Sequence, residues 1–339
     1  MQYLSIKSIS INVAFVRAAI AKLTYTADQV DALLLASKIP PDLLHQPQAR
    51  VTLQQYAQLI TALIDATKDE MLGHTHQVMP TGSLSLLTHW MAGADTIGQA
   101  IQRLDRFYTI VNDSIELNVE VDHDWVVLNI GPGSHERDSD AYVYEFMFFF
   151  IHRIVCWLQK QLFPIAHIAF PFAQPERAND HRLMFYGAPV TYDQRTAQIT
   201  FSKALLEQLI KQDLKALNTM LDNPIGALLM LNFHGDSWSS KVADVAQSQL
   251  SSMPSLPDIA AQLDIQPYTL QRRLKQEGVT YLDIKNQLKR DAAIEWLTNS
   301  ELSIEAISAQ LGFVETSPFT RTFKQWTGVP PSAYRKRQT

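Results

Sequence analysis

Two stretches near the end of the chain place the same hydrogen-bonding side chains at the same spacing. They read LQRRLKQEGV, residues 270–279, and FTRTFKQWTGV, residues 319–329. A shift of 49 positions brings Arg272 onto Arg321 and Lys275 onto Lys324. An arginine can donate two parallel hydrogen bonds to a guanine edge, whereas a lysine suits a phosphate. These residue types offer the chemistry of recognition rather than that of bond making.

The repeated stretch is the second half of a larger repeat. In each copy a short apolar helix precedes a tight turn and the basic helix, and residues 256–278 and 304–328 form the two copies. Apolar residues at helical spacing pin the two helices of a copy together and leave the second helix with a polar outer face. This is the helix-turn-helix pattern, whose second helix enters the DNA major groove. Two copies joined by a long helix over 282–297 can reach two successive major-groove segments, about 34 Å apart.

Residues 238–337 resemble the DNA-binding domain of AraC/XylS-family transcription regulators. The residues that carry the resemblance are Ile307, Leu311-Gly312-Phe313, Phe319, Arg321, Phe323-Lys324, Gly328, Pro331 and Tyr334-Arg335. The resemblance implies an all-α domain with double-stranded DNA and RNA polymerase as partners. It departs from the family at Val314, where a capping serine is usual, so Glu315 or Thr316 is expected to cap the last recognition helix.

The resemblance also implies which side chains meet DNA. The base-reading positions fall on Tyr268, Gln271, Arg272, Thr316, Ser317, Thr320 and Arg321. Lys275, Lys324 and Arg335 are expected to contact phosphates, which set affinity and salt dependence. Because small hydroxyl side chains dominate the second copy, we expect it to position the protein more than it specifies sequence. Arg273 is interpreted as part of a solvated face.

Bulk properties fit a two-domain cytoplasmic protein. The chain has 339 residues and a net charge of −5, but residues 238–339 carry 12 basic and 10 acidic residues. The single cysteine, Cys156, excludes an intramolecular disulfide, fits a reducing compartment, and is expected in the core. The N-terminus shows no signal peptide, and the apolar run 142–158 predicts a buried helix rather than a membrane span.

The first 237 residues predict an α+β domain with an antiparallel sheet, separated from the helical domain 238–339 by a serine-rich stretch from Gly235. Alternating apolar residues predict a hairpin over 114–121 and 124–130 and further strands near 167–173, 190–192 and 199–201. The spacing of apolar residues predicts helices over 27–37, 53–68, 97–111, 141–161, 203–211 and 213–221.

Residues 163–210, with parts of the chain before them, resemble the arabinose-binding-type N-terminal domain of some AraC relatives, including regulators of ornithine and arginine type. The resemblance implies a sensor for a small effector, sometimes combined with dimerisation. Candidate effector-binding residues are Trp90, Tyr144, Phe148, His152 and Arg153. A buried arginine or histidine among aromatic rings could hold a carboxylate. The alternative is that the aromatic residues are plain core, and the leucines over 203–221 could form either a dimer seam or intrachain packing.

Other chemistry finds little support in the sequence. His74 and His76 lie two apart without a cysteine or carboxylate cluster, so solvated loop histidines are expected rather than a metal site. Gly131-Pro-Gly133 predicts a turn, and neither a dinucleotide fingerprint nor a phosphate-binding Walker loop occurs. The sequence therefore predicts no enzyme and no cofactor.

Two functions remain open at this stage. The first is a ligand-responsive transcription regulator, most simply an activator, and the second is a constitutive DNA-binding regulator whose N-terminal domain only dimerises. An enzyme with a partner-binding helical tail would have no use for two basic helices at this spacing.

Overall fold

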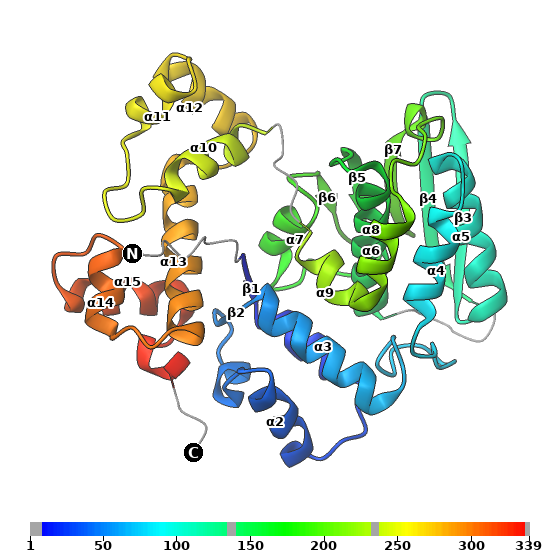
Figure 1. Cartoon of the computed structure of the whole chain (residues 1–339), viewed down its shortest axis with the longest axis horizontal. Coiled ribbons are helices and arrows are strands. Elements are labelled where there is room, and N and C mark those ends of the chain that lie inside the picture. The colour runs from blue at the N-terminus through cyan, green and yellow to red at the C-terminus, as the bar shows by residue number, and fades with distance from the viewer. Residues whose placement is uncertain (1–8, 134–139, 232–236, 336–339) are drawn as a thin grey trace. The chain divides into compact units, whose positions relative to one another are not determined.

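The structure is a computed structural model that describes residues 9–133, 140–231 and 237–335 (Figure 1). The chain forms two compact units. The first comprises residues 1–16, 34–56 and 234–339, and the second comprises residues 17–33 and 57–233. The sequence placed the border near residue 237, which adjoins residues 232–236 outside the described part. The first unit also takes in N-terminal segments that the sequence analysis had grouped with the sensor domain.

The second unit is built around a five-stranded sheet with the strand order β3-β4-β7-β5-β6. Its strands are β3 (Ile115–Asp122), β4 (Trp125–Pro132), β5 (Ile165–Ala169), β6 (Val190–Thr191) and β7 (Ala197–Ser202). All neighbouring pairs are antiparallel except β5 and β6, which are parallel. His123 adopts a left-handed conformation, φ 43°, at the turn of the predicted hairpin.

Helices of this unit lie against the sheet and against one another. They are α4 (Ser83–Ala92), α5 (Ile97–Val111), α6 (Ala141–Gln159), α7 (Ala178–Met184), α8 (Leu214–Asp222) and α9 (Pro224–Leu229), with the short 3-10 turn η2 (Lys203–Leu205). α5 packs along β3, α4 packs on α5 and α8, and α9 packs on α6. Thr96 and Asp140 cap α5 and α6 by accepting hydrogen bonds from Gln99 N and Tyr142 N.

α6 is the central helix of this unit. It is long and apolar enough to cross a membrane by length and composition, but 89% of that window is buried inside the protein. Burial confirms the expected core helix. Cys156 is likewise buried, and burial raises the pKa of its thiol to about 12.

Several expectations for this unit were wrong, including the turn at Gly131 and Pro132, which belong to strand β4, and one predicted strand is displaced. The predicted helix 203–211 stops after η2, because the following chain pairs with the start of α5: Ile97 N donates to Gln208 O, and Gly98 N donates to Leu206 O. A Cβ at Gly98 would lie 3.0 Å from that Leu206 oxygen, so the close approach favours glycine. The strand predicted near 167–173 occupies Ile165–Ala169 and ends before Pro171. His74 is buried and stacked on Tyr142 at 4.2 Å, rather than solvated.

The first unit joins a helical region to a small N-terminal sheet. The sheet pairs β1 (Ser10–Asn12) with β2 (Arg50–Thr52), and the helices are α10 (Trp238–Gln247), α11 (Leu256–Gln262), α12 (Pro267–Gln276), α13 (Tyr281–Asn299), α14 (Ile304–Gln310), α15 (Thr316–Thr327) and η3 (Pro331–Arg335). The turn η1 (Pro41–His45) belongs to the same unit, and α1 (Ala14–Ile20), α2 (Ala27–Ala36) and α3 (Leu53–Thr67) each run from one unit into the other.

A buried polar network ties the small sheet to α13 and η3 within the first unit. Ser10 Oγ donates to Asp291 Oδ1 at 2.5 Å, and Arg50 Nε donates to Ser10 Oγ at 2.8 Å. The Arg50 backbone N–H donates to the Tyr334 hydroxyl at 3.0 Å. Nothing in the local sequence pattern indicated this connection, because its partners lie up to 284 positions apart.

Candidate DNA-binding surface and effector sites

The first helix-turn-helix pairs α11 with α12. Ser255 and Asp258 form a capping box at the start of α11, and the hydrogen bonds from Ser255 hold the pKa of Asp258 below its usual range. Pro267 occupies the first turn of α12, where its missing N–H costs nothing. Ile259, Leu270 and Leu274 are buried in one cluster, so the inner face of α12 is fixed.

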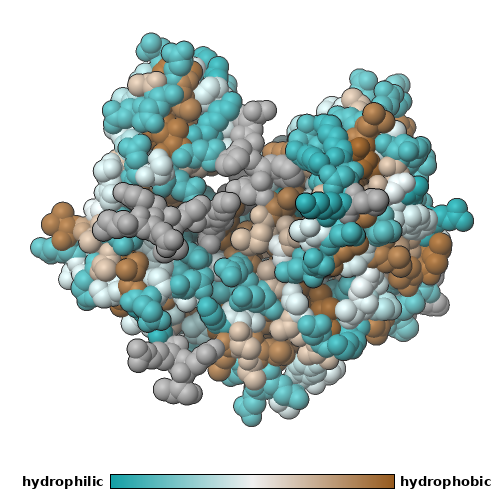
Figure 2. Space-filling view, in the orientation of Figure 1, coloured by the Kyte–Doolittle hydropathy of each residue, from teal (hydrophilic) through white to brown (hydrophobic). Residues whose placement is uncertain are grey.

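The outer face of α12 carries the predicted DNA contacts of the first copy. Tyr268 is 76% exposed, and Gln271, Arg272 and Lys275 are also exposed. These four side chains lie at positions i, i+3, i+4 and i+7, so they share one face of the helix. Figure 2 shows hydrophilic residues over much of the surface formed by α10, α11 and α12.

Arg273, by contrast, is not simply solvated. Its guanidinium stacks over the Trp238 ring at 4.1 Å, and Glu277 accepts hydrogen bonds from the backbone N–H groups of Trp238 and Ser239. One cation–π contact and one carboxylate cap therefore hold α12 against the start of α10. Sequence reasoning missed this contact because Trp238 stood alone in a serine-rich stretch.

The second helix-turn-helix pairs α14 with α15. Ser303 caps α14 by accepting from Ala306 N, and Ile307, Leu311, Phe319 and Phe323 are buried between the helices. Gly312 has φ +77°, and a Cβ there would lie 2.1 Å from the Ser251 carbonyl oxygen, so only glycine fits this turn. The glycine of the sequence Leu311-Gly312-Phe313 thus has a direct steric cause.

The start of α15 lacks the side-chain cap considered from the sequence. Glu315 occupies the N-cap position, but its side chain makes no capping hydrogen bond, and Val314 is fully exposed. Ser317, Arg321 and Lys324 are exposed, whereas Thr316 and Thr320 are half-buried. The polar face of α15 therefore offers shorter side chains than that of α12.

Arg335 differs from the two lysines expected to contact phosphates. It lies in η3, is half-buried, and donates from its guanidinium to the Leu302 carbonyl oxygen. This contact joins η3 to the loop before α14. The structure therefore gives Arg335 a partner inside the domain, and that partner competes with any phosphate.

The predicted effector residues lie in the second unit, mostly on α6. Tyr144, Phe148, His152 and Arg153 are buried there, whereas Trp90 is half-buried on α4 and its carbonyl accepts from Arg103. Phe148 packs against Phe170, and Tyr144 stacks with Phe172. The four α6 residues thus share a helix, while Trp90 stands on a different one.

Arg153 and His152 are the charged and titratable members of that group. Arg153 lies over the rings of Phe149 and Tyr186 at 4.9 and 4.6 Å and donates to the Leu231 carbonyl oxygen at 2.8 Å. Its Nε is buried and finds no hydrogen-bond partner within the described residues. His152 Nε2 lies 3.0 Å from the Phe163 carbonyl oxygen, and burial, aided by the Arg153 charge, lowers its pKa to about 3. His152 is therefore neutral at physiological pH.

This unit contains an open groove and a small cavity among its described residues. A groove of about 460 Å³ is lined by Trp157, Asp213, Lys215, Ala216, Thr219, Met220, Ala227 and Leu231. It adjoins Leu231, whose carbonyl pairs with Arg153, and its volume suits a metabolite-sized ligand. A much smaller enclosed cavity lies beside Glu70 and Tyr108. Within the described residues no group of three histidine, cysteine or carboxylate side chains could hold a metal ion.

Comparison with known proteins agrees with both parts of the chain. Residues 29–210 match the arabinose-binding domain found at the N-terminus of AraC transcription regulators, and residues 259–337 match a helix-turn-helix domain. The ornithine utilization regulator of Pseudomonas aeruginosa is 22% identical over 306 residues, which cover 90% of each chain. The regulator VirS of Mycobacterium tuberculosis is 36% identical over 98 residues, or 29% of each chain.

Among solved structures, the transcriptional regulator CdpR from Pseudomonas aeruginosa aligns with 93% of this chain and 99% of its own, at 19% identity and a TM-score of 0.34. Both of the curated relatives are named as regulators. The chain belongs to the AraC family of DNA-binding transcription regulators, with an arabinose-binding-type N-terminal domain.

Proposed function

We propose that this regulator is a ligand-responsive activator whose α12 and α15 read successive major-groove segments of one DNA site. The observation that carries the proposal is the two-sided character of both helices. Each buries two large apolar side chains against its partner helix and turns a row of hydrogen-bonding side chains to solvent. A helix of that kind fits the major groove, and two of them specify a site longer than one helical turn.

In this proposal the first copy specifies and the second mainly positions. Tyr268 packs on a thymine methyl group, Gln271 pairs with an adenine edge and Arg272 with a guanine edge. Thr316, Ser317, Thr320 and Arg321 make the base contacts of the second copy. Lys275, Lys324 and, where it leaves Leu302, Arg335 contact phosphates, which fix the register of the protein on DNA.

Selection of bound duplexes from a random pool, with the full chain, tests this arrangement. We expect two conserved half-sites whose centres lie about 10 base pairs apart on one DNA face. Hydroxyl-radical footprinting should show protection on that same face. A single conserved half-site of one groove width, unaltered by substitutions in α15, would contradict the proposal.

The N-terminal domain, in this proposal, senses a small effector. Its support is the buried and incompletely bonded Arg153 beside aromatic rings and a groove of metabolite size. A carboxylate would satisfy Arg153, with Tyr144, Phe148, His152 and Trp90 shaping the surroundings. The name of the ornithine utilization regulator makes amino acids the first compounds to try. The regulator would act in the cytoplasm at the nucleoid, contacting RNA polymerase and, through its N-terminal domain, a second copy.

The competing proposal is a constitutive regulator whose N-terminal domain only dimerises. Two leucines of the predicted dimer seam, Leu205 and Leu217, are buried by packing within the chain. Leu209 is 66% exposed. Thermal melting of the full chain with amino acids, sugars, fatty acids and aromatic acids separates the two ideas. A ligand at 100 times its Kd should stabilise the protein by about 2.7 kcal/mol. A flat response to the whole panel, with a concentration-dependent dimer, would favour the competitor.

A further inference from the structure

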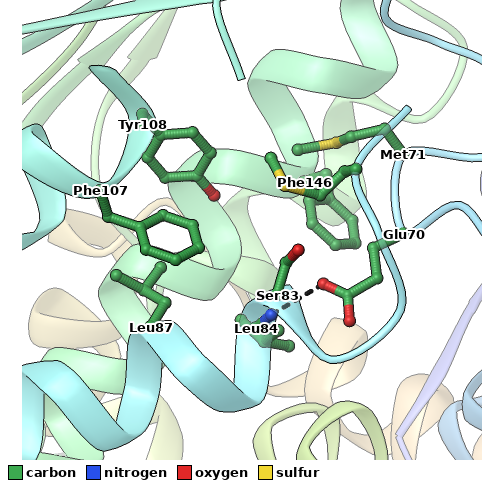
Figure 3. Close-up of a pocket in the computed structure, with 9 residues that line it drawn as sticks. Glu70, Met71, Ser83, Leu84, Leu87, Phe107, Tyr108 and Phe146 are labelled. Atoms are coloured by element: carbon green, nitrogen blue, oxygen red, sulfur yellow. Dashed lines mark hydrogen bonds between the residues drawn. The ribbon is translucent and has the colours of Figure 1, made fainter. Parts of the chain in front are cut away.

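A small enclosed cavity lies in the second unit between α4, α5, α6 and the loop that follows α3. It offers about 10 Å³ to the centre of a water-sized group. Met71 and Met79 come from the loop, Ser83, Leu84 and Leu87 from α4, and Phe146 from α6. Figure 3 shows the Glu70 carboxylate and the Tyr108 hydroxyl entering from opposite sides with their oxygen atoms turned inward. The hollow is thus lined mainly by apolar side chains but carries two polar groups.

Backbone hydrogen bonds hold the Glu70 carboxylate in place, but no cationic side chain pairs with it within the described residues. Its two oxygens accept from Gly82 N at 2.7 Å and Leu84 N at 2.8 Å, at the first turn of α4. The backbone N–H of Ser83 also acts on the carboxylate, whose roughly four acceptor positions are still not all filled by these donors. No lysine, arginine or histidine pairs with Glu70 in the described part of the chain, and burial raises the pKa of its carboxyl group. The cavity therefore presents a positioned acid that lacks a cation.

Tyr108 supplies an unused donor and acceptor. The residue is buried on α5, and Figure 3 marks no hydrogen bond between its hydroxyl and the other residues that line the cavity. Burial and the nearby Glu70 charge raise the pKa of the phenol, so the hydroxyl stays protonated. A buried hydroxyl in this state is costly unless a bound group pairs with it.

The remaining lining decides which ligand chemistry fits. The rings of Phe107, Tyr108 and Phe146 attract a cation through their π faces, and the methionine thioethers are polarisable and adaptable. An anion would meet the Glu70 carboxylate, and a purely apolar ligand would leave both polar groups unpaired. An ammonium group satisfies the carboxylate, the hydroxyl and the rings together, and its head is about the size of a water molecule.

We propose that this cavity is a binding site for the ammonium head of a primary amine, held by Glu70 and Tyr108, and that the flexible side chains of the buried Met71 and Met79 move to admit the alkyl chain. The site deepens the proposed function, on which its regulatory meaning rests, by naming amines as an effector class. Because Glu70 also holds the first turn of α4, amine binding would act directly on the packing of that helix.

Thermal melting of the full chain tests the site with n-butylammonium chloride as the probe. Sodium butyrate, n-butanol and potassium chloride serve as the anionic, neutral and ionic-strength controls. We expect n-butylammonium alone to raise Tm with a saturable dependence on concentration. Tyr108→Phe, which removes one hydroxyl, should weaken the apparent Kd about tenfold, and Glu70→Gln should abolish the shift. Tyr142→Phe removes a buried hydroxyl outside the cavity and should keep the wild-type response.

The experiment distinguishes failure of the proposed amine site from failure of the proposed effector sensing. The site is overturned if n-butylammonium leaves Tm unchanged, or if Tyr108→Phe responds as the wild type does. A shift with butyrate alone, lost in Arg153→Gln, would also overturn the site but would support effector sensing at Arg153. Should Glu70→Gln fail to fold through loss of the α4 contact, Tyr108→Phe and Tyr142→Phe still decide the question.

Discussion

At the scale of single residues, the exposed polar face of α12 is where sequence specificity should reside. Arg272 is exposed, while its neighbour Arg273 is stacked on Trp238. We therefore expect Arg272→Ala to weaken specific binding by about 1–3 kcal/mol and to relax base preference at one position. Binding titrations against single-base variants of the selected site measure both effects. An unchanged base preference would remove Arg272 from the reading face.

Arg273→Ala is the matched control for that experiment. It removes the same charge one position along, but it breaks the contact with Trp238. We expect it to lower the stability of the first helix-turn-helix while the base preference of the remaining bound protein stays as it was. A change of preference in this variant would mean that specificity depends on helix placement rather than on Arg272.

Lys324 represents the other class of contact. It is exposed on α15, next to the small hydroxyl side chains of that helix. Because a phosphate contact carries no base identity, Lys324→Ala should weaken binding to all duplexes alike and reduce the salt slope by about one ion. Kd values measured between low and moderate salt, for specific and random duplexes, give the comparison. A loss confined to the specific duplex would reassign Lys324 to base reading.

His152 should leave a signature in the pH dependence of stability. Its folded pKa of about 3 lies below the ordinary value of 6.5, so between these values the unfolded chain binds a proton that the folded protein does not. Stability is therefore unaffected above pH 6.5 and falls as pH drops below it, by at most about 1.4 kcal/mol per pH unit. Urea unfolding at pH 7, 6 and 5 should show a shallower decline for His152→Gln than for the wild type. Substitution of the exposed His123 should leave the wild-type slope, and identical slopes for all three proteins would contradict a buried neutral imidazole.

At the scale of elements, the recognition helices depend on a small core. Leu274 is 1% exposed and packs in the cluster that holds α11, α12 and α13 together. Leu274→Ala should cost about 2–5 kcal/mol through the cavity that it leaves, and hydrogen exchange should quicken first in α11 and α12. Gln276→Ala, at an exposed position of the same helix, serves as the control. Wild-type protection in α12 of the leucine variant would show that this cluster does not hold the helix.

Elements with strong local signals could be predicted, and those made by distant partners could not. The helix Ile97–Val111 and the hairpin around His123 follow from periodicity and turn geometry, and the structure confirms both. The helix expected over 203–211 failed because backbone pairing with Gly98 outweighed local helical propensity. The polar outer face of α12 could be predicted from the spacing of its apolar residues. The pairing of Glu70 and Tyr108 at one cavity could not, because they lie 38 positions apart and no sequence motif joins them.

At the scale of the whole molecule, the compact units do not follow the chain in order. β1, β2 and the chain around them belong to the unit that contains both helix-turn-helix copies. The connection is polar and buried: Ser10 and Arg50 reach Asp291 on α13 and Tyr334 in η3. A buried carboxylate that loses its donors is destabilised, so the N-terminal segment contributes to the integrity of the helical region.

This arrangement predicts that a fragment cut at the apparent domain border is weakened. In the fragment 238–339, Asp291 loses Ser10, and the Tyr334 hydroxyl loses the Arg50 N–H. We expect faster hydrogen exchange in α13 and η3 than in the full chain. The full-length variant Ser10→Ala should reproduce part of the loss, by about 1–3 kcal/mol, because it leaves the buried carboxylate without that donor. Ser239→Ala, on the same unit but outside the network, should exchange as the wild type does. Equal protection of α13 in the fragment and the full chain would mean that the helical region holds Asp291 without help from the N-terminal sheet.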